Sequence, residues 1–306
     1  MTSFLPADVD TRAMQVPELV AVGPLTVFPG VRSHLEIQYA GPVGFRPLTL
    51  DLHVPEPVDG RPAPVAVYCH GGGFMIGSRR MGPWRFLLDA GLAVASVGYR
   101  FSGEGVFPTG VQDAVAAIRW VRSNAEEFGL DAARIVGFGS SAGAYLVSAA
   151  ALMHKHPDLV GDLGPTPGVS CELAAVVEHY GPSDFLHMDD DAPTDAVELM
   201  DAPGSSIARY LGYVPSEQPE RADEAGLLRY AAPDAPPFLI FHGDDDHRVG
   251  LGQSRRLHGA LTAAGAHAEL VVVPGADHAS PHFDQPQVHQ ATMTFLRAVL
   301  DLPGVG

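Results

Sequence analysis

Cysteine is scarce in this chain of 306 residues, which contains only Cys69 and Cys171. Two cysteines cannot cross-link a protein of this size, so the composition excludes a disulfide-stabilised secreted scaffold. Both lie in apolar runs, and we expect them to be buried, unpaired thiols in a reducing compartment. The N-terminal segment 1–14 has neither the cationic start nor the apolar stretch of a secretory signal. We therefore expect a cytoplasmic protein.

Basic residues are also few, since 19 Lys and Arg stand against 36 Asp and Glu, which gives a formal net charge of −17. The basic residues do not gather into a run. A negative surface repels phosphate backbones and anionic lipid headgroups, because binding to them requires a patch of Lys and Arg. Nucleic acid and membranes are therefore not expected as partners. The expected partner is a small molecule, and the sequence leaves a homodimer open.

Long uncharged runs are rare as well. Residues 135–153 carry no charged side chain and are about as long as a membrane span, but their glycines and serines make them poorly apolar. We interpret this segment as a strand, a sharp turn and a buried helix. No membrane span is predicted.

The chain does contain the alternation of an α/β protein. Short alternating stretches at 35–39 and 48–54 predict antiparallel strands at a sheet edge. Beyond residue 60, buried strands are predicted at 64–69, 92–99, 134–138, 173–178, 238–242 and 269–273, and helices at 111–128, 142–153, 252–264 and 287–300. This order predicts a single domain, residues 1–306, with a mostly parallel sheet and helices on both faces. Residues 185–232 lack a clear strand and are predicted to form a cap insertion.

A sharp turn follows the strand predicted at 134–138. Residues Gly139 to Gly143 match G-x-S-x-G, the nucleophile elbow in which a tight strand-to-helix turn exposes a serine. Ser141 is therefore the candidate nucleophile. Any small-residue turn can spell this pattern by chance, and Gly137-x-Gly139-x-x-Ala142 also resembles a dinucleotide fingerprint. Such a fingerprint usually opens the first βαβ unit, whereas several strands precede this one, so no cofactor is expected.

A glycine-rich loop follows an earlier strand, at His70-Gly71-Gly72-Gly73-Phe74. Consecutive glycines leave backbone N–H groups unshielded, and such groups can bind the negative oxygen of a tetrahedral intermediate. The expected oxyanion donors are the N–H groups of Gly72, Gly73 and Ala142. Phe74 and Met75, beside this loop, are expected to line an apolar acyl pocket. A merely flexible loop is the alternative, but its pairing with a later elbow favours the oxyanion role.

A serine hydroxyl becomes nucleophilic when a base takes its proton and a carboxylate orients that base. On such a sheet the acid and then the base follow the serine, each on a loop after a strand. The acidic run 244–246 follows one predicted strand, and His278 follows the last. We expect His278 to be the base, and Asp277 beside it to be structural.

Two other histidines, His247 and His282, compete for the role of base. His278 and His282 also have the H-x-x-x-H spacing of a zinc pair, but Pro281 disfavours a helix there and no Glu follows His278. No metal site is predicted.

Taken together, these motifs resemble the α/β-hydrolase superfamily, and more narrowly the hormone-sensitive-lipase and feruloyl-esterase-like carboxylesterases. The resemblance covers residues 64–300 and selects Asp246 from the acidic run as the triad carboxylate. The motifs that carry it are HGGGF at 70–74, Gly98-Tyr99-Arg100 with Asp113, GSSAG at 139–143, YGPSDF at 180–185, PDAPP at 233–237 and His242-Gly243-x-x-Asp246.

The chain departs from the family pattern at three places. His247 and Gly250 stand where the family usually has prolines, Asp277 stands where Gly is usual, and Ala144 replaces a common second Gly of the elbow. The first two departures add a titratable group near each end of the Asp–His pair, so an unusual pH profile is expected.

The resemblance implies a serine carboxylic-ester hydrolase that uses Ser141, His278 and Asp246 and forms an acyl-enzyme. The expected substrate is a small soluble ester. Two alternatives stay open: an amidase of the formamidase type with the same triad, and a non-hydrolytic member such as a cyclase, a lyase or a ligand-binding protein.

Overall fold

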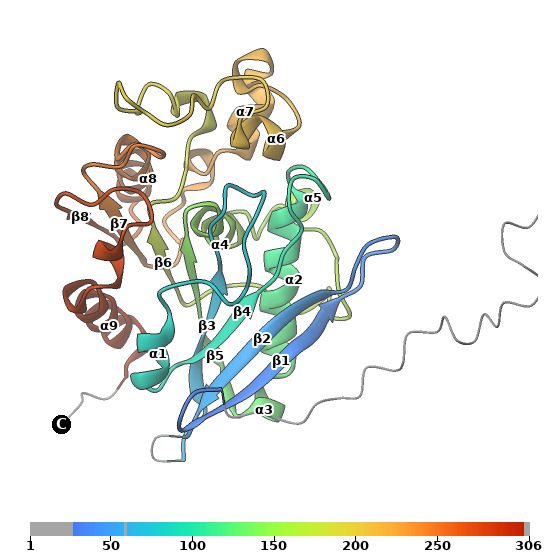
Figure 1. The fold of residues 1–306 in the computed structure, drawn as a ribbon. Helices are drawn as coiled ribbons and strands as arrows, with labels where there is room; N and C mark the ends of the chain where they lie inside the picture. The colour runs from blue at the N-terminus through green and yellow to red at the C-terminus, as the bar shows by residue number, and fades with distance from the viewer. Residues whose placement is uncertain (1–26, 58–59, 303–306) are drawn as a thin grey trace, which may run out of the picture.

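The computed structural model describes residues 27–57 and 60–302, which build one eight-stranded sheet with helices on both faces (Figure 1). The strand order is β1-β2-β4-β3-β5-β6-β7-β8. β1, β2 and β4 pair antiparallel, and all pairs from β4 to β8 are parallel. The strands are β1 (Val31–Ala40), β2 (Leu48–Pro55), β3 (Ala63–Cys69), β4 (Ala93–Val97), β5 (Leu130–Ser140), β6 (Ala175–His179), β7 (Phe238–Gly243) and β8 (Ala268–Val273).

The predicted mostly parallel sheet is confirmed, and each predicted helix is found in the predicted order. The helix predicted at 111–128 is two helices, because the chain leaves helical geometry at Asn124, whose side-chain amide donates to the carbonyl of Trp120. Short helices also lie where none was predicted, namely α1, α5 and, within the segment predicted as a cap, α6 and α7. The helices are α1 (Arg85–Asp89), α2 (Thr109–Ser123), α3 (Ala125–Phe128), α4 (Ala142–Leu152), α5 (Pro157–Val160), α6 (Ser206–Leu211), α7 (Pro219–Ala225), α8 (Gly252–Ala263) and α9 (Pro286–Leu300).

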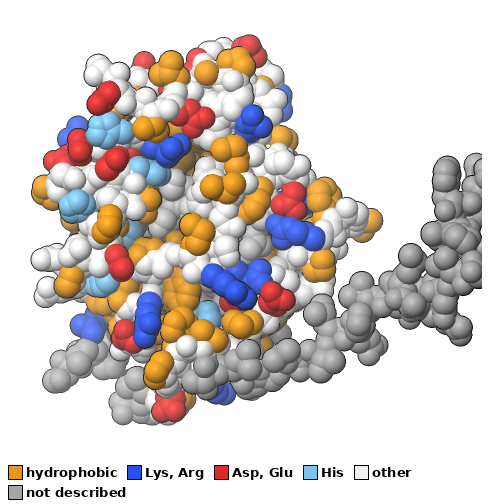
Figure 2. All heavy atoms as spheres, viewed as in Figure 1, with side chains coloured by type: hydrophobic (Ala, Val, Ile, Leu, Met, Phe, Trp, Pro, Cys, Tyr) orange, Lys and Arg blue, Asp and Glu red, His pale blue; other side chains and the backbone are white. Residues whose placement is uncertain are grey.

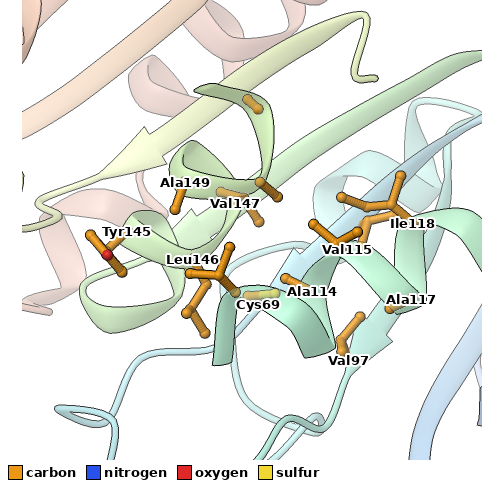
Figure 3. Packing of buried hydrophobic residues seen from close by; sticks show 14 of the residues in the cluster. Cys69, Val97, Ala114, Val115, Ala117, Ile118, Tyr145, Leu146, Val147 and Ala149 are labelled. Atoms are coloured by element: carbon orange, nitrogen blue, oxygen red, sulfur yellow. The ribbon is translucent and has the colours of Figure 1, made fainter. Parts of the chain in front are cut away.

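Two apolar clusters cover the two faces of the sheet. Alternate residues of β3 enter different clusters, because successive side chains of a strand point to opposite faces. Val67 and Cys69 belong to the cluster that contains residues of α2, α4 and α8, whereas Ala66 and Tyr68 belong to the cluster that contains residues of α1 and α9. Figure 3 shows Cys69 between Leu146 of α4 and residues of α2.

Both cysteines are buried and unpaired. Burial raises the pKa of the Cys69 thiol to about 12, because the thiolate would lose its hydration. Cys69 therefore behaves as a small apolar residue of the core.

The connection between β6 and β7 contains the segment that was predicted as a cap. Residues 185–232 hold α6, α7 and three 3-10 turns (Phe185–His187, Pro215–Glu217, Leu228–Tyr230), and no strand is assigned there. Figure 1 shows α6 and α7 at the upper end of the sheet. Ile207, Tyr210 and Leu227 join the larger apolar cluster, so this segment packs on the same core as the sheet.

Within residues 27–57 and 60–302, no helix combines the length and the apolarity needed to cross a bilayer. The expected absence of a secretory signal concerns segment 1–14, which lies outside the described residues.

Candidate active site

Ser141 stands between β5 and α4 in a conformation that L-residues rarely adopt, with φ 54° and ψ −122°. The glycines on either side are required by space. A Cβ atom on Gly139 would lie 2.4 Å from the carbonyl oxygen of Gly143, and one on Gly143 would lie 2.0 Å from the carbonyl oxygen of Cys69. The turn can therefore form only with glycine at both positions, and it raises the serine above the carboxyl edge of the sheet.

The loops after β7 and β8 bring two polar side chains to this serine. The Nε2 atom of His278 lies 2.8 Å from Oγ of Ser141, and its Nδ1 atom lies 2.8 Å from Oδ2 of Asp246. All three residues follow parallel strands, whose carboxyl ends meet at one edge of the sheet. The candidate nucleophile, base and orienting acid are thus connected by two hydrogen bonds, with the three residues in the predicted chain order.

Asp246 is held as a carboxylate. Its Oδ1 atom accepts the backbone N–H groups of Arg248 and Val249, each at 2.8 Å. Burial opposes the charge, but hydrogen bonds from His242 and His278 outweigh it and hold the pKa of Asp246 well below its ordinary value. A carboxylate in this state fixes the Nδ1–H tautomer of His278 and leaves Nε2 free to accept a proton from Ser141.

The ring of His278 is also held from its side. Tyr180 packs edge-on against it, with ring centroids 4.8 Å apart, and the backbone N–H of His278 donates to Oδ1 of Asp277 at 2.7 Å. Sequence reasoning did not single out Tyr180, although it begins the YGPSDF motif that carried the family resemblance.

The two competing histidines make other contacts. His247 lies with Nδ1 at 3.4 Å from Oδ1 of Asp277, and that hydrogen bond raises the pKa of His247. The Nδ1 atom of His282 lies 3.0 Å from Oγ of Ser280. The structure therefore brings His278, of the three candidates, to hydrogen-bond distance of Ser141.

The glycine-rich loop lies directly against the elbow. A Cβ atom on Gly71 would be 3.3 Å from Cβ of Ser141, so the two backbones are in close contact. Gly72 and Gly73 have φ +131° and +59°, and a Cβ atom on Gly72 would lie 1.9 Å from the carbonyl oxygen of Ile76. These two glycines and Ala142, the first residue of α4, line the same cavity as Ser141. The three residues expected to supply oxyanion donors therefore line the same cavity as the candidate nucleophile.

This cavity has a volume of about 820 Å³ and is lined mainly by apolar side chains. Both residues expected to bind substrate, Phe74 and Met75, line this cavity, but their exposure differs. Met75 is 39% exposed, whereas Phe74 is only 2% exposed because its ring is stacked on Tyr210 at 3.8 Å. Phe74 is therefore part of the buried packing beneath the cavity surface, whereas the side chain of Met75 is accessible from the cavity.

Other cavity residues come from segments that sequence reasoning did not connect with the site. Met188 and Met200 enter from the predicted cap, and Met81 lies in the chain segment that follows the glycine-rich loop. Arg248 also lines the cavity and lies 3.5 Å from Glu198 of the cap. No local pattern marks these residues, because only the folded chain brings them together.

Acidic and histidine side chains gather at the upper left of Figure 2, where Figure 1 draws the predicted cap segment and the loops after β7 and β8. Among the residues that the structure describes, no group of three or more His, Cys, Asp or Glu side chains is arranged to hold a metal ion.

Comparison with known proteins gives consistent matches. The BD-FAE family model matches residues 50–261. The chain is 30% identical to the isoprenylcysteine alpha-carbonyl methylesterase ICME of Arabidopsis thaliana, over 78% of this chain and 55% of that protein. It is also 30% identical to esterase LipQ of Mycobacterium tuberculosis, over 87% of this chain and 61% of LipQ. The chain thus spans little more than half the length of these curated relatives.

A solved structure is similar over nearly its whole length. A truncated carbohydrate esterase from gut microbiota superposes with a TM-score of 0.79 at 27% identity, covering 88% of this chain and 96% of that one. Together with the mostly parallel sheet, this similarity confirms the predicted α/β-hydrolase fold.

Proposed function

The chain belongs to the BD-FAE family, and from that premise we propose that it is a carboxylesterase with Ser141 as its nucleophile. The observation that carries the proposal is the hydrogen-bonded series from Ser141 through His278 to Asp246, with both distances 2.8 Å. The relatives named above as esterases support the same activity at the level of the family.

In the first half of the reaction, His278 Nε2 takes the proton of Ser141 as Oγ attacks the acyl carbon. The carbonyl oxygen becomes an oxyanion, and the N–H groups of Gly72, Gly73 and Ala142 donate to it; one such donor contributes about 3 kcal/mol to lowering the barrier. The imidazolium of His278, stabilised by Asp246, then returns its proton to the leaving alcohol. The products of this half are the alcohol and an acyl-enzyme on Ser141.

In the second half, His278 takes a proton from water, and the resulting hydroxide oxygen attacks the acyl carbon. The tetrahedral intermediate collapses, the proton returns to Oγ of Ser141, and the carboxylic acid leaves. Each group thus ends the cycle in its starting state.

The substrate that best fits the cavity is a small ester with an apolar acyl group. Four methionines line the cavity, Met75, Met81, Met188 and Met200, and methionine adapts its shape to apolar ligands. The names of the relatives indicate different kinds of ester, a methyl ester in one and a carbohydrate ester in another. The proposal is therefore restricted to the acyl group of the substrate.

The nucleophile is tested by Ser141→Ala. We expect the loss of covalent labelling by a fluorophosphonate probe and a fall in kcat of up to about a million-fold, because the step that forms the acyl-enzyme is removed. Ser140→Ala is the matched control, since Ser140 is the neighbouring serine and its Oγ accepts from Tyr68 instead. Labelling that persists in Ser141→Ala would place the nucleophile elsewhere.

The acyl preference is tested with p-nitrophenyl esters from acetate to decanoate. A defined apolar cavity predicts an optimum chain length in kcat/KM, beyond which the rates fall. Equal rates at all lengths would show that the cavity does not select the acyl group.

A further inference from the structure

A second series of polar side chains lies behind the triad, on the side of Asp246 that faces away from Ser141. It comprises Glu178 at the end of β6, His242 in β7 and Ser254 in α8. Glu178 is 1% exposed, and His242 and Ser254 are fully buried. Buried carboxyl and imidazole groups cost folding free energy unless they are paired, so the retention of three adjoining polar groups calls for a role.

The contacts run without a break from Glu178 to the triad. Oγ of Ser254 lies 3.4 Å from Oε1 of Glu178 and 2.6 Å from Nδ1 of His242. Nε2 of His242 lies 2.7 Å from the carbonyl oxygen of Val249 and 3.3 Å from Oδ2 of Asp246. That carboxylate oxygen is the one that binds His278.

The donor and acceptor roles limit where protons can reside. The carbonyl of Val249 can only accept, so Nε2 of His242 carries a hydrogen. The Ser254 hydroxyl has one proton, which it donates either to Nδ1 of His242 or to Glu178. In the first case His242 is neutral; in the second, Nδ1 carries a hydrogen and His242 is a cation facing a Glu178 carboxylate. One proton is therefore shared by Glu178 and His242, and its loss leaves a negative charge behind Asp246.

The surroundings of Glu178 favour the protonated form of its carboxyl group. Burial raises the pKa of Glu178 to about 7, although His242, the N–H of Gly181 and the Ser254 hydroxyl act against the rise. The groups that face Glu178 are His242 from β7, Ser254 from α8 and Tyr180 from the loop after β6, with Asp246 beyond His242.

We propose that Glu178 is a positioning residue of the triad, which acts through Ser254 and His242 to set the charge behind Asp246. With Glu178 ionised and His242 neutral, the added negative charge stabilises the imidazolium that forms on His278 during catalysis. The inference rests on the proposed esterase function. It implies that Glu178 adds a second ionisation to the pH profile of kcat/KM and that this ionisation raises the activity.

Glu178→Gln tests this inference with little change of shape. The amide oxygen can accept from the N–H of Gly181, and the amide nitrogen can donate to Ser254, which then donates to His242. We expect the pH profile with p-nitrophenyl acetate, measured from about pH 5 to 9, to show one ionisation in place of two. Activity at the alkaline end should fall roughly 3- to 10-fold, with little change at the acidic end.

Two further variants complete the experiment. Ser254→Ala breaks the link while keeping the Glu178 carboxyl, and it should move the second ionisation to higher pH, because the Ser254 hydroxyl no longer favours the charged form of Glu178. Glu172→Gln removes the same charge from an exposed position and should leave the wild-type profile. A profile of wild-type shape in Glu178→Gln and Ser254→Ala, or a fall by the same factor at every pH, would overturn the inference.

An infrared measurement on the wild type covers the case in which these variants fail to fold. A protonated buried carboxyl should lose its carbonyl band as the pH rises through about 7, and the absence of any such titrating band would also overturn the inference.

Fluorophosphonate labelling of the wild type is recorded alongside. Missing labelling refutes the esterase proposal, whereas intact labelling with an unchanged profile refutes only the role of Glu178.

Discussion

A single carboxylate oxygen, Oδ1 of Asp277, accepts the backbone N–H groups of His247 at 3.0 Å and of His278 at 2.7 Å. It thereby connects the loop that carries Asp246 to the loop that carries His278. The two backbone N–H groups hold the pKa of Asp277 below its ordinary value, since they favour the charged form. Glycine, usual here in the family, could not make this connection.

Replacing Asp277 should therefore affect catalysis through the position of His278. We expect Asp277→Ala to lower kcat/KM about ten-fold, because a small displacement of the base is costly. Asp277→Asn keeps an acceptor oxygen for both N–H groups and should remain within about two-fold of the wild type. Ester hydrolysis at fixed pH measures both variants, and equal losses in the two would show that the charge, rather than the connection, matters.

Among the secondary-structure elements, the first turn of α4 lies so close to the end of β3 that Gly143 could not carry a side chain. The carbonyl oxygen of Cys69, at the end of β3, occupies the place of a Cβ on Gly143. This approach brings the glycine-rich loop and the elbow together, so the packing of one helix on one strand determines how closely the proposed oxyanion donors approach Ser141.

Two glycine-to-alanine substitutions separate this packing effect from helix propensity. Gly143→Ala should destabilise the fold by about 2 to 4 kcal/mol, because the added methyl group meets backbone that cannot move aside. Gly259→Ala in α8 adds its methyl to open space and should stabilise by about 0.5 to 1 kcal/mol. Urea unfolding measures both, and similar free energies for the two variants would contradict the packing argument.

At the scale of the whole molecule, a buried histidine links stability to pH. His179 lies among Phe138, Phe241 and Phe283, and neither ring nitrogen has a hydrogen-bond partner in the part of the chain that the structure describes. Burial lowers its pKa to about 3. The unfolded chain takes up this proton near pH 6.5, so stability is lost as the pH falls from about 6.5 toward 3.

Replacing this histidine should reduce the loss of stability in acid. We expect His179→Phe to stabilise by about 1 to 3 kcal/mol at neutral pH, since an unpaired buried polar group is removed, and to stabilise more at about pH 5. Urea midpoints at about pH 5 and 8 measure the difference. His156→Phe, at an exposed histidine, is the control. An equal gain at both pH values would show that His179 does not titrate with unfolding.

Sequence patterns predicted most of the elements because these depend on neighbouring residues. The apolar run of β5, the glycines around Ser141 and the small residues of α4 specify strand, turn and helix without reference to the rest of the chain. The order of serine, acid and histidine on loops after parallel strands likewise needs only the topology, whereas the choice of Asp246 within the acidic run came from the family resemblance. The structure connects Ser141, His278 and Asp246 by two hydrogen bonds. The break in the helix at Asn124 was missed because the apolar stripe continues across it.

What tertiary structure alone decided is the environment of these groups. Glu178 and Ser254 are 76 residues apart and meet only because β6, β7 and α8 pack side by side. Met188 and Met200 line the cavity because the segment between β6 and β7 folds back over it. No periodic sequence pattern indicates the path of that segment. Local patterns determine where strands and turns lie, whereas contacts between distant elements depend on packing distances and registers that individual segments do not encode.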